Sequence, residues 1–320
     1  MNGKKWVKIW IIMVIFVPII GGFNYLIDPY GENYYFDHSS MNKLKIIQDE
    51  RQLKFNYLKN NTNYNSVILG NSKGTYIDPS IIKRYTGLET YNASFSAGTM
   101  NEFLEYTKWL INNRDVKQLF IVFDFYSLSE FNSNGNMPVD LRKGNPIIFN
   151  YFSLSKLKDS IKTIRYNLKN NKEVEFESKV YLGKGMRYEK DYFERQHSLK
   201  KQLEHINYLK TKKIVWYGKN ISEERMDNLR DIVKLCDEGN VKLFLLNTPN
   251  SYVKLNSNSR KHYKKLLSLI KNIAQIHPVY FFNDFNYVNN DLKYFFDNSH
   301  FSYDVNEFLL ERIFLEKGIG

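Results

Sequence analysis

The sequence has one cysteine, Cys236, among its 320 residues. An intramolecular disulfide is therefore excluded. Cys236 lies in the helix-like stretch DNLRDIVKLCDEG, where the expected role is a small buried hydrophobic side chain. No cluster of cysteine and histidine has the spacing of metal ligands, so the sequence predicts no metal site and no cofactor.

Runs of five or more like charges are also missing, although the net charge is +12. Lysine and arginine alternate with glutamate and aspartate along the chain. Nucleic-acid binding is therefore not expected, since it usually needs a concentrated basic patch. The positive excess would equally suit a protein that faces anionic lipids or teichoic-acid-type polymers.

Charged residues are absent between Ile9 and Ile27, a stretch that is mostly apolar. A membrane-spanning helix needs about 20 such residues. The preceding residues 1–8 are basic and would stay in the cytoplasm as a short tail. No small-x-small cleavage site follows, which disfavours a signal peptide. The sequence predicts a transmembrane anchor at 9–27, with the rest of the chain on the outer side of a bacterial cell membrane.

After a polar connector at 28–64, short apolar runs alternate with helix-like segments. This alternation predicts an α/β domain over 65–320, a three-layer sandwich around a central parallel sheet. Residues 130–220 interrupt the pattern and are predicted to be an insertion: a lid, a docking surface or a solvated excursion. The strands are expected at 66–70, 89–95, 117–125, 241–247 and 278–285. The helices are expected near 41–59, 79–86, 100–113, 222–238, 258–275 and 303–316.

Two loops after predicted strands carry glycines next to polar residues. Ser72 follows the first strand, between Gly70 and Gly74, and Asp78-Pro79 is a typical helix start. Gly98 follows the second strand and directly precedes Thr99-Met-Asn-Glu102, which fits a capping box. An amide at such a helix start can stabilise an oxyanion.

Near the C-terminus, Asp297 and His300 lie three residues apart, before the last predicted helix. A carboxylate at this spacing can accept a hydrogen bond from the imidazole Nδ1 and leave Nε2 to take a serine proton. The alternative is a surface pair that only caps the helix. This pair is the strongest indication of chemistry in the sequence.

In combination, these blocks resemble the SGNH or GDSL-like serine hydrolases. Gly70-Asn71-Ser72, Gly98 and Asp297-Asn298-Ser299-His300 match three of the family's blocks in order, over about residues 65–316. The resemblance implies an SGNH- or flavodoxin-like sheet, Ser72 as nucleophile, His300 as general base and Asp297 as its orienting partner. It implies an oxyanion hole made by the amides of Ser72 and Gly98.

Two positions depart from the family pattern. The family's acidic residue before the serine is Asn71 here, and its third-block asparagine has no match after the third strand, which ends in VFDFYS. Asp124 in that segment would repel an oxyanion unless it were protonated. Tyr126, Asn71 or Asn92 would have to donate in place of the missing asparagine.

The anchor and the SGNH-like blocks together are similar to the teichoic-acid D-alanyl transfer protein and the alginate O-acetylation proteins. That similarity implies a serine O-acyltransferase or esterase acting on an envelope glycan or teichoic-acid-type polymer, with a multi-span membrane acyltransferase as partner. The alternative is a catalytically silent SGNH-like module that binds glycan or scaffolds a membrane acylation complex.

Overall fold

A computed structural model gives the fold of the chain. It describes residues 3–33, 41–45, 50–130, 137–138, 141, 151–169, 184–186, 199–211, 220–256 and 259–315.

The centre of the fold is a parallel sheet of five strands in the order β2-β1-β3-β4-β5. The strands lie where apolar runs predicted them, and burial on both faces explains why those runs are almost uninterrupted. The predicted central parallel sheet is thus confirmed. The bounds are β1 Ser66–Gly70, β2 Thr90–Asn92, β3 Gln118–Val122, β4 Lys242–Asn247 and β5 Val279–Phe281.

The strand order reverses beside β1, because β2 lies on one side of it and β3 on the other. In doubly wound sheets ligands bind at this point, outside the carboxyl ends of the strands. The register brings these ends level: Gly70 of β1 pairs with Val122 of β3, which pairs with Leu246 of β4. Loops that follow β1, β3 and β4 therefore meet at one edge.

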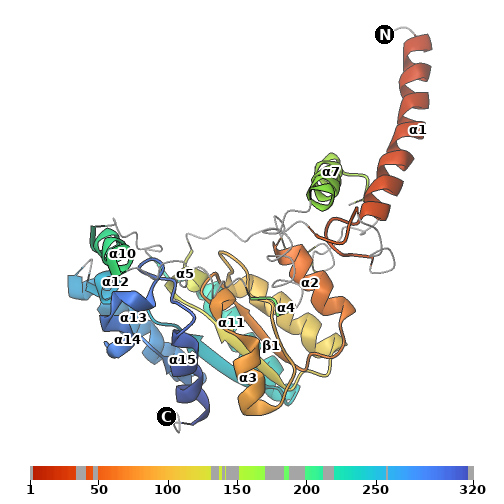
Figure 1. Cartoon of the computed structure of the whole chain (residues 1–320). Coiled ribbons are helices and arrows are strands. Elements are labelled where there is room, and N and C mark those ends of the chain that lie inside the picture. Colours follow the sequence, from red (N-terminus) through yellow and green to blue (C-terminus); the bar gives the residue numbers. More distant parts are fainter. Residues whose placement is uncertain are drawn as a thin grey trace. The chain divides into compact units, whose positions relative to one another are not determined.

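Helices flank the sheet, as Figure 1 shows. One buried cluster joins Ile68 and Phe120 of the strands to Ile81 and Leu309 of two helices. Helices α4 and α11 pack against each other on the opposite face. The long helices of this part are α3 Pro79–Thr86, α4 Met100–Asn113, α10 Leu199–Thr211, α11 Glu223–Glu238, α13 Ser259–Ala274 and α15 Val305–Phe314. The short ones are η3 Gly74–Tyr76, α5 Phe125–Leu128, α12 Tyr252–Asn256, α14 Tyr287–Asn290 and η5 Leu292–Tyr294.

The chain divides into two compact units. Unit 1 comprises Met1–Asn61 and Asn136–Gly183, and unit 2 comprises Thr62–Gly135 and Lys184–Gly320. The segment predicted as a single insertion at 130–220 is therefore shared: its middle part belongs with the N-terminal residues, and α10 belongs with the sheet. Unit 1 contains α1 Gly3–Ile27, α2 Glu50–Asn60 and α7 Leu154–Leu168.

A continuous helix, α1, covers the uncharged segment 9–27. Among the residues that the structure describes, no helix is both long enough and apolar enough to cross a membrane. The transmembrane helix predicted at 9–27 is therefore not supported. The last turns of α1 pack within unit 1, where the buried Asn24 side chain donates to the carbonyl of Tyr151 at 2.6 Å and accepts from the Ser160 hydroxyl.

Candidate active site

A tight turn after β1 presents Ser72. The buried Asn71 side chain accepts a hydrogen bond from the Lys73 amide at 3.0 Å, and the Gly74 amide donates to the Asn71 carbonyl at 2.9 Å. A β-carbon on Gly74 would lie 2.6 Å from the Ser94 hydroxyl oxygen, so this approach requires glycine. Asn71 therefore shapes the turn that holds the serine.

The structure brings Ser72, His300 and Asp297 together, although the first two are 228 residues apart in sequence. The Ser72 Oγ lies 2.8 Å from His300 Nε2, and His300 Nδ1 lies 2.8 Å from Asp297 Oδ2. Both distances are those of hydrogen bonds. This is the connected chain of nucleophile, base and orienting carboxylate that serine acyl chemistry needs.

Asp297 is held in its ionised form. Burial alone would raise its pKa, but hydrogen bonding and charge attraction from His300, together with the amides of Ser299 and His300, lower the pKa below its ordinary value. Those amides donate to Asp297 Oδ1 at 2.7 and 2.9 Å, which leaves Oδ2 for the imidazole. The imidazole therefore carries its proton on Nδ1 and offers the Nε2 lone pair to Ser72.

The loop that carries His300 is supported by three other segments of the chain. Asn298 is buried; it accepts from the Ser251 hydroxyl at 2.9 Å and donates to the carbonyl of Leu209, on α10, at 3.1 Å. The ring of Tyr76 lies 5.5 Å from the imidazole, centre to centre. Residues from η3, the loop before α12 and the C-terminal half of α10 therefore all support the base.

Gly98 lies at the end of β1, as an oxyanion donor should. A β-carbon on Gly98 would come within 2.9 Å of the Gly70 carbonyl oxygen and 2.7 Å of the Phe103 ring, so only glycine fits. Ala97 before it has a φ of +55°, an uncommon conformation for alanine. In the described part of the chain, neither the Ser72 amide nor the buried Gly98 amide donates a hydrogen bond. Both amides are thus available to a ligand.

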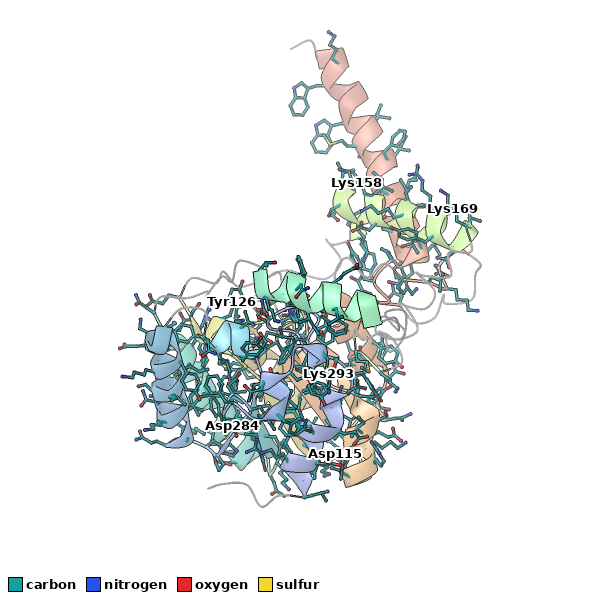
Figure 2. All side chains as sticks on the ribbon, turned by 60° about the vertical axis from the view of Figure 1, so that its left-hand side comes forward. Asp115, Tyr126, Lys158, Lys169, Asp284 and Lys293 are labelled. Atoms are coloured by element: carbon teal, nitrogen blue, oxygen red, sulfur yellow. The ribbon has the colours of Figure 1, made fainter. Side chains whose placement is uncertain are left out.

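The candidates for a third donor differ in what their side chains do. Both amide hydrogens of Asn92 donate to carbonyls, those of Gly74 at 2.7 Å and Ile77 at 2.8 Å, so Asn92 holds the loop after β1 and has no hydrogen left for an oxyanion. Asn71 donates to the Ser127 hydroxyl at 3.1 Å. Tyr126 lies on α5 and is labelled in Figure 2; it lines a small cavity together with Lys73 and Asp124.

Asp124, which was expected to repel an oxyanion unless it were protonated, is paired with a lysine in the structure. Burial alone would raise its pKa, but Lys73, Lys254 and the Ser127 amide lower it below the ordinary value. The carboxylate lies 3.4 Å from the Lys73 ammonium, which compensates its charge. Sequence reasoning missed both lysines, since nothing in the pattern distinguishes them from the many other lysines of the chain.

Within the described residues, no group of three or more histidine, cysteine, aspartate or glutamate side chains could hold a metal ion. The site geometry is built from a serine, an imidazole, a carboxylate and backbone amides. It can carry nucleophilic acyl chemistry without further groups.

Comparisons with known proteins add little to this geometry. No known family description matches the chain, and no curated protein matches it. Among solved structures, a provisionally assigned acylhydrolase from Bacteroides fragilis is similar with 12% identity and a TM-score of 0.39, over 84% of this chain and 96% of that one.

Proposed function

We propose that this protein is a serine esterase or O-acyltransferase that works through an acyl-enzyme on Ser72. The observation that carries the proposal is the hydrogen-bonded series from Ser72 through His300 to Asp297 at the carboxyl edge of the sheet. Three separate segments have to converge for this series to form. A helix-capping pair would not need a serine on the far side of the imidazole.

The geometry defines the steps. Ser72 Oγ attacks the ester carbonyl carbon while its proton passes to His300 Nε2. The carbonyl oxygen becomes an oxyanion that the amides of Ser72 and Gly98 can bind. The bond to the alcohol then breaks, and His300 returns the proton to the leaving oxygen. Water or a second hydroxyl attacks the acyl-enzyme by the same route, which gives hydrolysis or transfer.

The finer part of the proposal concerns the substrate and the location. We propose an envelope polysaccharide or teichoic-acid-type polymer as the acyl acceptor, and a multi-span membrane acyltransferase as the partner that supplies acyl groups. The net charge of +12 suits an anionic polymer or lipid surface. The proposed location, the outer side of the cell membrane, rests on the basic residues 1–8 and the uncharged segment 9–27 of the sequence alone.

Labelling with a small fluorophosphonate tests the nucleophile. The full chain should gain one adduct, found on Ser72 by peptide mass spectrometry, and Ser72→Ala should gain none. Ser268→Ala, which removes an exposed hydroxyl on α13, is the matched control and should label as the wild type does. Equal labelling of the Ser72→Ala protein would remove Ser72 from the mechanism.

Intact mass after incubation with acyl donors separates transfer from hydrolysis. An acyl-enzyme that disappears in water alone identifies an esterase. One that persists until a glycan or polyol phosphate is added identifies a transferase. Absence of labelling with several probes of different size would favour the silent binding module.

A further inference from the structure

A small cavity of about 40 Å³ lies in unit 2, and two of the residues that line it are connected to the triad. Lys73, the residue after Ser72, lines it, and so does Lys254, whose ammonium donates a hydrogen bond to the hydroxyl of Ser299, the residue before His300. One water needs only about 10–15 Å³. The space is therefore enough for a small ionised group. The remaining lining residues are Asp124, Phe125, Tyr126, Asn247, Asn250 and Leu266.

Lys73 is held in place by a built network. Its side chain is 4% exposed, and its ammonium donates to Asn250 Oδ1 at 2.9 Å and lies 3.4 Å from Asp124. Asn250 is fixed in turn, because its backbone and side-chain amides both donate to Asn283 Oδ1. An ammonium has three N–H donors. The described residues supply acceptors for two, so one donor remains at the cavity.

The charges around the cavity favour an anion. Asp124 is the one carboxylate in its lining, whereas two lysines line it. Burial and the repulsion from Lys73 lower the pKa of Lys254 to about 7, against the attraction of Asp124 and Asp297. An entering anion would therefore meet the Lys73 charge and draw a proton onto Lys254.

We propose that this cavity binds an anionic group of the substrate, a carboxylate or a phosphate, close to the ester bond that Ser72 attacks. The inference rests on the proposed function, because the group is recognised as part of an ester substrate. It makes the enzyme selective for acidic esters, and it gives Lys73 and Lys254 the role of binding residues.

The test compares pairs of esters that differ in one anionic group. On the acyl side, 4-nitrophenyl butyrate is compared with 4-nitrophenyl hemisuccinate, which ends in a carboxylate. On the alcohol side, phenyl acetate is compared with 4-acetoxyphenyl phosphate. The readout is the ratio of kcat/KM for the charged ester over the neutral one, measured for the wild type, Lys254→Gln and Lys264→Gln. Lys264 is an exposed lysine on α13 and gives the matched loss of charge outside the cavity.

We expect the wild type to prefer the charged ester of at least one pair by about tenfold, the size expected of one hydrogen bond to a charged group. Lys254→Gln should bring the ratio near one, and Lys264→Gln should keep it. The pair that shows the preference tells whether the site takes a carboxylate on the acyl side or a phosphate on the alcohol side of the ester. The wild-type preference should also weaken as the pH rises through about 7, where Lys254 loses its proton while Lys73, Asp124 and Asp297 face it. This pH dependence is measured on the wild type alone, so it does not depend on whether a variant folds.

The inference is overturned if the wild type prefers neither charged ester, or if the preference survives both Lys254→Gln and the rise in pH. Fluorophosphonate labelling of Ser72 in the same samples separates the two hypotheses. Labelling without any preference for charged esters refutes the anion site alone. A protein that neither labels nor turns over any ester refutes the proposed function and the site with it.

Discussion

Asp297 is the residue whose substitution best separates chemistry from folding. It accepts from His300 Nδ1 with one oxygen and from two backbone amides with the other. Asp297→Asn presents an N–H to the imidazole, so Nε2 no longer faces Ser72 as an acceptor. We expect kcat on an activated ester to fall about 10²- to 10⁴-fold with KM nearly unchanged. The control is Asp304→Asn, which changes an exposed carboxylate in the same segment. Equal losses of kcat in the two variants would mean that the substitutions act through local folding.

The variant Gly98→Ala tests whether the Gly98 amide is part of the oxyanion hole. In Gly98→Ala the new methyl would lie within 2.9 Å of the Gly70 carbonyl and 2.7 Å of the Phe103 ring, so the loop must shift and carry its amide away. We expect kcat to fall about 10²- to 10³-fold, as when one oxyanion donor is lost. Gly22→Ala is the control, since nothing lies within 4 Å of its β-carbon. Undiminished kcat in a folded Gly98→Ala protein would place the oxyanion elsewhere.

Among single residues, the sequence predicts those that stand in a recognisable pattern with their neighbours. The Asp-x-x-His pair is such a pattern, and so is a serine directly after an apolar strand. The structure brings Ser72, Asp297 and His300 together. Asn92 is one of three candidate donors in the sequence, but which acceptors its amide meets depends on how the loop after β1 folds. The burial of Lys73 likewise depends on distant residues such as Asn250, which no local pattern shows.

Among the elements, α10 connects the segment between β3 and β4 to the base. Asn298 joins the loop of His300 to the carbonyl of Leu209 on α10 and to the Ser251 hydroxyl. Asn298→Ala removes both side-chain bonds and takes the donor from the buried Leu209 carbonyl, which costs about 1–3 kcal/mol. The Ser251 hydroxyl keeps the backbone carbonyl of residue 298 as an acceptor. We expect kcat to fall about tenfold or more, with KM little changed and faster amide exchange at 297–300. Asn290→Ala, which removes a bond from an exposed asparagine to the Phe285 carbonyl, should change neither.

Helix ends with a capping residue were predicted closely. Helix α3 begins after Asp78, whose side chain accepts from the Ser80 amide, and Glu102 accepts from the Thr99 amide at the start of α4. These signals are local, so the sequence alone contains them. The attachment of α10 to the active-site loop was not predicted, because Leu209 and Asn298 are 89 residues apart and meet through a backbone carbonyl.

For the molecule as a whole, the order of apolar runs predicted the sheet and therefore the edge where Ser72 and His300 meet. The division into two units was not predicted. Residues 136–183 group with residues 1–61 through contacts such as Asn24 with Tyr151, and neither residue forms a recognisable motif. Parallel sheets follow from hydrophobic patterning, whereas contacts between polar side chains and backbone carbonyls do not.

The free energy of unfolding of unit 2 should decrease in acid. The pKa values of Asp78, Asp124 and Asp297 are all lowered in the fold, against burial that alone would raise them. A lowered carboxyl pKa stabilises the fold fully above the unfolded value of 3.8 and ceases to do so as the pH falls through the folded value. The free energy of unfolding should therefore be level with respect to these groups above about pH 5, where unfolded carboxyls are ionised, and decrease below it.

Asp78→Asn isolates one of these contributions. Asparagine keeps the helix cap through its one oxygen but cannot titrate. It loses the attraction of Lys184, and its amide nitrogen replaces the oxygen that accepts from the Tyr303 hydroxyl. The variant should be less stable than the wild type at pH 7, and the difference should shrink toward pH 3, as measured by urea unfolding at each pH. Asp115→Asn, at a side chain 81% exposed and labelled in Figure 2, should leave the profile unchanged. A difference between Asp78→Asn and wild type that stays constant with pH would mean that the variant loses only an uncharged hydrogen bond, such as the one from Tyr303, and that the charge of Asp78 adds nothing to the stability of the fold.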